Sequence, residues 1–197
     1  MVYTKVEAKM TIEEMKSKLK SSLTEKRYVH SIGVMDTAVK MACKWGADTE
    51  KTAIAALLHD CAKNYSISET LELCNKYNVY LDDVTKTATG LIHGFLGAEI
   101  ARDIYGIRDD DIYDAIYYHT VGKPDMKLMT EIIYIADGIE PNRHYDGVDR
   151  IREMAFEDID RALILQIDST IKSVINKGGL LHTNTVDTRN FYLKKIR

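Results

Sequence analysis

The segment from residue 49 to residue 63, TEKTAIAALLHDCAK, constrains the fold more than any other part of the chain. If this segment forms a helix, apolar side chains cover almost its whole circumference after the first turn. A helix of this kind is stable only when other elements pack around it on all sides. The segment therefore predicts a helix at the centre of the fold.

Helical patterns also precede and follow this segment. Thr11 and Glu14 have the spacing of a capping box, which satisfies the free backbone N–H groups at the start of a helix. Gly46 and Gly106 stand where helices are expected to end. No stretch alternates apolar and polar residues for long enough to predict a strand. Further helices are expected at residues 11–23, 24–45, 66–77, 91–105, 109–119, 127–139, 157–176 and from about residue 185.

The expected fold class is therefore all-α, a helical bundle. Only 2 Pro and 11 Gly occur among the 197 residues, which argues against an architecture with many tight turns. A chain of this length buries enough surface for a core without disulfides or structural zinc. Because no repeat or long polar linker divides the sequence, we expect residues 1–197 to form a single domain.

Charge and cysteine content narrow the expected partners and location. The chain has 27 Lys and Arg against 30 Asp and Glu, a net charge of −3, whereas a nucleic-acid-binding protein normally carries a basic surplus. No apolar run approaches the roughly 20 residues of a membrane span, and residues 1–10 lack the apolar core of a secretory signal. The three cysteines show no C-x-x-C spacing, which suits a reducing compartment. We therefore expect a cytoplasmic protein that contacts neither nucleic acid nor membrane.

Four histidines and two aspartates interrupt the apolar parts of the predicted helices. A single histidine on an apolar face is usually a hydrogen-bonded core residue, but buried imidazoles and charges each cost several kcal/mol unless they are paired or coordinated. Helices of a bundle can bring such side chains to one point, and this donor set suits iron, manganese, nickel or zinc. The six together therefore favour a metal site: His30, His59, Asp60, His93, His119 and Asp137.

The adjacent pair His59 and Asp60 adds a geometric condition. Consecutive residues of a helix point about 100° apart, so two neighbours share one metal only where the helix ends. The polar residues that follow the pair indicate such an end. Arg27 precedes His30 by one helical turn and Lys63 follows Asp60 by one turn, so both cations are expected to reach the same cavity.

The order H…HD…H…H…D in an all-helical chain resembles the HD-domain phosphohydrolase superfamily. The resemblance covers about residues 20–193 and narrows to the bacterial YqeK group. It departs from the pattern of that group after His182, where this chain has Thr183 and Asn184. The segments that carry the resemblance are RYVHSIGV (27–34), AALLHDCAK (55–63), IHGFLGAEIA (92–101), YYHTVG (117–122), IYIADGIEPNR (133–143) and TVDTRN (185–190).

The resemblance implies a metal-dependent hydrolase that cleaves diadenosine tetraphosphate symmetrically into two ADP by attack of a metal-activated water. It implies iron, as one or two ions, in a core of about residues 24–140, with C-terminal helices in residues 148–197 closing the nucleotide site. His30, His59, Asp60 and Asp137 would hold the first metal. His93 and His119 would hold a second metal or phosphate and, with Lys63, would be catalytic. The implied substrate-binding residues are Arg27, Lys63, Arg143, Thr185, Arg189 and Asn190.

Other functions stay open at this point. The chain could be another HD-type nucleotide phosphohydrolase, a cyclic-dinucleotide phosphodiesterase, or a nucleotide-sensing module with a structural metal and no turnover. In every case the expected partner is a small molecule, a dinucleoside polyphosphate or a nucleoside diphosphate. A homodimer is compatible with the sequence.

Overall fold

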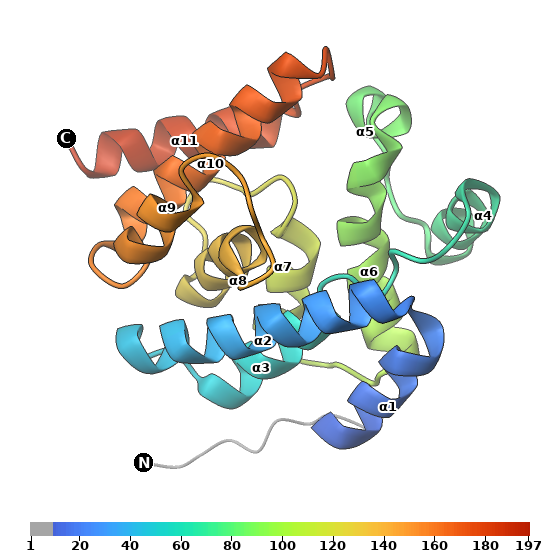
Figure 1. The fold of residues 1–197 in the computed structure, drawn as a ribbon. Coiled ribbons are helices and arrows are strands. Elements are labelled where there is room, and N and C mark those ends of the chain that lie inside the picture. The colour runs from blue at the N-terminus through green and yellow to red at the C-terminus, as the bar shows by residue number, and fades with distance from the viewer. Residues whose placement is uncertain (1–9) are drawn as a thin grey trace.

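The chain folds into helices throughout the part that the structure describes. The computed structural model describes residues 10–197, which contain eleven α-helices, one 3-10 turn and no strand (Figure 1). The all-α prediction is confirmed. No helix within residues 10–197 combines the length and the apolar character that a bilayer span requires. In chain order the elements are α1 (Ile12–Ser22), α2 (Glu25–Trp45), α3 (Thr49–Leu58), α4 (Ile67–Tyr77), α5 (Asp83–Thr87), η1 (Thr89–Leu91), α6 (Ile92–Ile104), α7 (Asp110–Tyr118), α8 (Leu128–Ile139), α9 (Val148–Met154), α10 (Ile159–Asn176) and α11 (Thr183–Lys195).

The helices begin and end where capping residues place their boundaries. Thr11 and Ser66 each form a capping box with the glutamate three residues later. Gly46 ends α2 with φ of +76°, a left-handed conformation that glycine adopts without strain. The sequence did not indicate α5 and α9 individually, because helices of five and seven residues are too short to show a clear period.

Helix α3 lies at the centre of the fold. Every residue from Thr52 to Leu58 is buried, and α3 packs against α1, α2, α7 and α8. Figure 1 shows α2 and α3 side by side, with α7 and α8 above them. The predicted central helix is therefore confirmed. Its last residue is Leu58, so His59 and Asp60 stand at the helix end, as the geometric condition requires.

The C-terminal helices pack on α8. Helix α10 contacts α8 and α9, and α11 contacts α10. The hydroxyl of Tyr192 on α11 donates a hydrogen bond to the buried carboxylate of Glu131 on α8. Gln166 on α10 lies directly against Gly138, where an added Cβ would lie 2.3 Å from the side-chain amide of Gln166. This contact places α10 beside the last turn of α8.

We predict that Gly138→Ala disrupts the contact between α8 and α10. An added Cβ would lie 2.3 Å from the amide of Gln166, whose oxygen accepts a hydrogen bond from Tyr145. Overpacking costs about 1–3 kcal/mol, and the free energy of unfolding from urea titration should fall by that amount. Gly179→Ala is the control, because its nearest contact would be an ordinary 3.4 Å. Equal losses in the two variants would contradict the prediction.

Candidate metal centre

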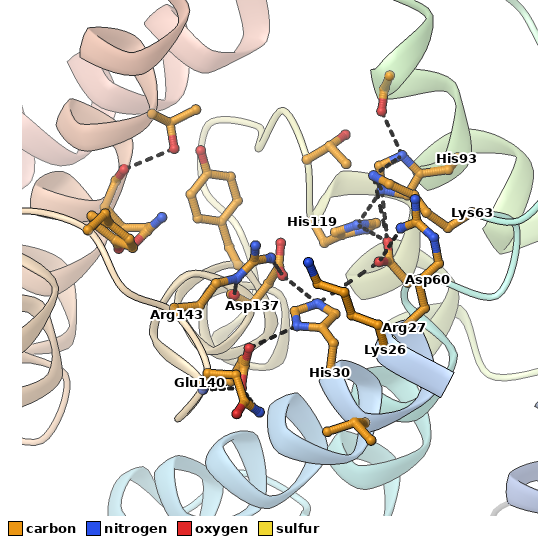
Figure 2. A pocket seen from close by; sticks show the side chains of 18 of the residues that line it. Lys26, Arg27, His30, Asp60, Lys63, His93, His119, Asp137, Glu140 and Arg143 are labelled. Atoms are coloured by element: carbon orange, nitrogen blue, oxygen red, sulfur yellow. Dashed lines mark hydrogen bonds and ion pairs between the residues drawn. The ribbon is translucent and has the colours of Figure 1, made fainter. Parts of the chain in front are cut away.

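Five helices bring the six predicted residues to one place. His30 lies in the second turn of α2, and His93 lies in the first turn of α6. His59 and His119 follow the last residues of α3 and α7, and Asp137 lies in the last turn of α8. Figure 2 shows the labelled side chains turned toward one another across a single pocket. Three groups of donor atoms each lie within 4.8 Å of one another: His30, His59 and Asp60; His59, His119 and Asp137; and Asp60, His93 and His119.

The cluster lies on the wall of a cavity of about 990 Å³. Five of the six residues line the cavity, and His59 lies behind them with 0% of its surface exposed. His93, His119 and Asp60 are also buried. The cavity therefore gives a ligand access to a cluster that is otherwise enclosed by protein.

Hydrogen bonds to backbone carbonyls fix the tautomer of three of the imidazoles. Each donates its Nδ1–H to the carbonyl three residues earlier in the chain. A carbonyl oxygen can only accept, so Nδ1 carries the proton and Nε2 keeps a free electron pair. The carbonyls of Ala56 and Ile116 lie in the last turns of α3 and α7 and have no partner inside the helix. Gly90 lies in the 3-10 turn that precedes α6. The bonds join His59 to Ala56 (2.6 Å), His93 to Gly90 (2.7 Å) and His119 to Ile116 (2.7 Å).

The free Nε2 atoms face carboxylates and one another. His93 Nε2 lies 3.0 Å from Asp60 Oδ1, 3.1 Å from His119 Nε2 and 3.0 Å from Nζ of Lys63. His30 Nε2 lies 3.0 Å from Asp137 Oδ1. Within residues 10–197, the buried Nε2 atom of His59 has no hydrogen-bond partner. Electron pairs that face each other at these distances repel unless a cation lies between them. The donor set therefore fits a divalent metal.

The pKa values agree with a site for a cation. Burial would raise the pKa of Asp60, but the neighbouring His59, His93 and Lys63 hold it well below its usual range. Asp137 also keeps a lowered pKa despite burial, because His30 and the other neighbours outweigh it. Both aspartates are thus ionised. Burial, with His93 and His59 nearby, lowers the pKa of His119 to about 3, so this imidazole is neutral.

Three of the predicted cationic residues lie on the cavity wall. Arg27 Nη1 and Lys63 Nζ each lie 3.9 Å from a carboxylate oxygen of Asp60. Arg143 lies on the side of Asp137, with Nη2 2.6 Å from Oδ1. Figure 2 shows Arg143 on one side of the cluster and Arg27 with Lys63 on the other. The positions expected from helical spacing are thus found for Arg27 and Lys63.

The structure does not bring the predicted C-terminal residues to this cavity. Thr185 is buried, and its hydroxyl donates to the carbonyl of Val121. Arg189 forms an ion pair with Asp168, and Arg189 and Asn190 line a separate hollow of about 350 Å³. The packing of α11 thus places these side chains apart from the cavity of the cluster, and their contact with the nucleotide stays a prediction.

Sequence reasoning missed several residues of the cavity wall. Glu140 is buried, and its Oε1 lies 3.1 Å from Nδ1 of His30. It belongs to the segment IEPNR, in which the sequence analysis assigned a role only to Arg143. Gln166 and Thr170 of α10 and the buried Tyr134 of α8 also line the cavity. Gln166 and Thr170 carried no local signal, since they lie on an ordinary amphipathic helix far along the chain.

Comparisons with known proteins agree on the family of this chain. The model of the HD domain family matches residues 27–142, which include all six residues of the cluster. The symmetrical bis(5'-nucleosyl)-tetraphosphatase of Bacillus subtilis (strain 168) is 40% identical over 92% of this chain and 97% of its own length. The enzyme of the same name from Halalkalibacterium halodurans is 38% identical over 87% of this chain and 91% of its own.

A solved structure is similar over nearly the whole chain. It is a crystal structure from Clostridium acetobutylicum, described as an HD superfamily hydrolase involved in NAD metabolism. Its sequence is 45% identical, and the superposition covers 94% of this chain and 98% of that one with a TM-score of 0.91. The similarity therefore includes the helices that carry the cluster as well as the C-terminal helices α10 and α11.

We predict that a divalent metal stabilises the folded chain through Asp60. A metal present at 100 times its Kd contributes about 2.7 kcal/mol, or roughly 5–10 °C in Tm for a chain of this size. Adding Mn²⁺ to chelator-treated protein should give this rise in a thermal unfolding scan. Asp60→Asn should abolish the rise, because it removes a negative charge shared by two of the donor groups.

Asp82→Asn is the matched control for this experiment. Asp82 pairs with Nε2 of His182 at 2.9 Å and does not line the cavity, so its removal should leave the rise in Tm intact. A full rise in Asp60→Asn, or a loss of the rise in both variants, would contradict the assignment of Asp60.

Proposed function

Because this chain belongs to the HD domain family, we propose that its histidine and aspartate cluster is the active site of a metal-dependent symmetrical bis(5'-nucleosyl)-tetraphosphatase. The substrate is diadenosine tetraphosphate, and the products are two molecules of ADP. The observation that carries this function is the convergence of the six cluster residues, five of them on the wall of one cavity, in a chain that matches enzymes of this name over almost its full length.

In this proposal His30, His59, Asp60 and Asp137 hold the metal. His93 and His119, which form a second donor group with Asp60, hold a second ion or a phosphate. When bound, a divalent metal polarises a phosphoryl oxygen and lowers the pKa of a coordinated water. We propose iron as the physiological ion from the family resemblance; manganese, nickel and zinc accept the same donors.

The cations of the cavity bind the phosphate chain. A tetraphosphate bridge carries about four negative charges, and attack at phosphorus concentrates charge on its oxygens. Arg27 and Lys63 lie beside Asp60, and Arg143 lies beside Asp137. Donors held in these positions stabilise charge that develops in the transition state without having to reorganise.

The arrangement of the cations supports symmetrical cleavage. Arg27 with Lys63, and Arg143, stand on opposite sides of the cluster (Figure 2). A substrate with two identical halves can extend across the cavity, so that each half meets cationic side chains and the middle of the bridge lies at the cluster. Hydrolysis there releases one ADP from each side.

Lys63 is better placed than His119 to assist the leaving group. His119 keeps its only proton on Nδ1, where it is bonded to the carbonyl of Ile116, so Nε2 has no proton to give. Burial lowers the pKa of Lys63, which makes its ammonium a readier proton donor. In this proposal the Nζ–H of Lys63 donates a hydrogen bond to the departing ADP oxygen, and His119 acts as a ligand.

The organisation of the whole protein is a further part of the proposal. A single domain over residues 1–197 is supported by the packing of α10 and α11 on the helices that carry the cluster. In this domain α10 closes one wall of the nucleotide cavity through Gln166 and Thr170. The cytoplasmic location and the homodimer stay predictions.

We predict that the protein loaded with Fe²⁺ or Mn²⁺ converts diadenosine tetraphosphate into ADP alone, two molecules for each substrate. Separation of the products by ion-exchange chromatography checks the prediction. The formation of AMP and ATP, or no cleavage, would contradict it. Cleavage of a cyclic dinucleotide with no action on the tetraphosphate would favour the alternative HD phosphodiesterase.

We also predict that Arg27→Ala raises KM for the tetraphosphate about tenfold or more. A charge-assisted hydrogen bond contributes about 1.5–3 kcal/mol, and 1.4 kcal/mol corresponds to a factor of ten. The rise in Tm on adding Mn²⁺ should be unchanged, because Arg27 donates no ligand. Arg102→Ala is the control, since Arg102 pairs with Asp110 outside the cavity. An unchanged KM in Arg27→Ala would remove Arg27 from the substrate site.

A further inference from the structure

His30 differs from the other three imidazoles of the cluster. It lies inside α2, in the second turn, where the carbonyls of the preceding turn already accept hydrogen bonds from the helix backbone. No free carbonyl is therefore available to fix its tautomer in the way that fixes His59, His93 and His119. The group within hydrogen-bond distance of its Nδ1 is instead a side chain, the carboxylate of Glu140, at 3.1 Å.

The carboxylate of Glu140 is held from several directions. Glu140 is only 2% exposed. Its Oε2 accepts from the backbone N–H of Asn142 at 2.7 Å and from the side-chain amide of Asn142 at 3.1 Å. Its backbone carbonyl accepts from Arg152, which also bonds the carbonyl of Ile139. These contacts leave Oε1 directed at His30, as Figure 2 shows.

A glycine on α2 leaves the space that this carboxylate occupies. Gly33 lies one turn after His30, and a Cβ at this position would be 2.7 Å from Oε2 of Glu140. Glycine in the interior of a helix is less favourable than alanine. Room for the Glu140 carboxylate is therefore the feature of the structure that accounts for Gly33.

We propose that Glu140 is a positioning residue of the metal centre: it holds His30 in the tautomer with the proton on Nδ1, so that Nε2 is free to bind the metal. A carboxylate can only accept a hydrogen bond from Nδ1–H. Partners of this kind behind a ligand imidazole fix its ring and raise its basicity, and their loss typically costs 10–100-fold in metal affinity. This inference rests on the proposed metal function of the cluster.

Glu140→Gln tests this positioning role, because the two N–H donors of Asn142 determine how the glutamine amide is oriented. Both N–H groups of Asn142 point at Oε2, so a glutamine here places its amide oxygen toward Asn142 and its NH₂ toward His30. The NH₂ is a donor, which forces Nδ1 of His30 to accept and moves the ring proton to Nε2. A substitution of nearly the same shape should therefore convert His30 into the tautomer that cannot bind metal.

Zn²⁺ is a suitable probe, because it is diamagnetic and accepts imidazole and carboxylate ligands. Competition with a chromophoric chelator measures its affinity, and ¹⁵N NMR of the histidine side chains reports which nitrogen of His30 carries the proton. We expect Glu140→Gln to bind Zn²⁺ 10–100-fold more weakly than the wild type. We also expect its His30 to be protonated on Nε2.

Glu131→Gln is the matched control. It makes the same exchange at a buried carboxylate inside α8, which accepts from Tyr192 outside the cavity. Gly33→Ala provides a second variant, in which the added Cβ would lie 2.7 Å from Oε2 of Glu140; its thermal unfolding is measured beside its Zn²⁺ affinity to show that it folds. It should lower Zn²⁺ affinity by displacing the carboxylate of Glu140 without removing its charge.

The outcomes separate this inference from the proposed function. Weaker Zn²⁺ binding in Glu140→Gln and Gly33→Ala, with normal binding in Glu131→Gln, supports the positioning role. Wild-type affinity in Glu140→Gln, an unchanged His30 tautomer, or an equal loss in Glu131→Gln overturns it and leaves the metal centre standing. Failure of the wild type to bind any divalent metal would overturn both.

Discussion

The site depends on carboxylate oxygens and imidazole Nε2 atoms that lie close together inside the protein. Oδ1 of Asp60 lies 3.0 Å from Nε2 of His93, and Oδ1 of Asp137 lies 3.0 Å from Nε2 of His30. Such an arrangement is unfavourable by itself, because buried charges and polar atoms need partners. A bound divalent metal would satisfy these donors. The same cation supplies the chemistry that hydrolysis of a phosphoric anhydride requires.

The helical fold provides this cluster through the ends of its helices. His59 and His119 stand where α3 and α7 end, and there the last carbonyls of each helix are free to fix the tautomer of the ring. The apolar circumference of α3 buries its end at the centre of the molecule. His30 lies inside a helix, where backbone carbonyls are not available, and a carboxylate from another helix end takes their place. Each ring needs an acceptor for its Nδ1–H. A backbone carbonyl provides it at the helix ends, and a carboxylate provides it inside α2.

Much of this could be predicted from the sequence, because it depends on local rules. Capping residues and the apolar period predicted most of the helices. The cost of burying six polar residues in apolar helices predicted that these residues lie together in one site. The positions of Arg27 and Lys63 followed from one helical turn of spacing. The far wall of the cavity could not be predicted, since the contact of Gln166 with Gly138 depends on how α10 crosses α8. The positions of Thr185, Arg189 and Asn190 could not be predicted for the same reason, because they depend on how α11 packs.

Anomalous diffraction from crystals of anaerobically purified protein tests the central claim most directly. The account predicts a peak for a bound transition metal between Nε2 of His59 and the carboxylates of Asp60 and Asp137, with His30 among the ligands. A map in which this volume contains no metal, or in which the metal lies at other residues while the enzyme is active, would contradict it.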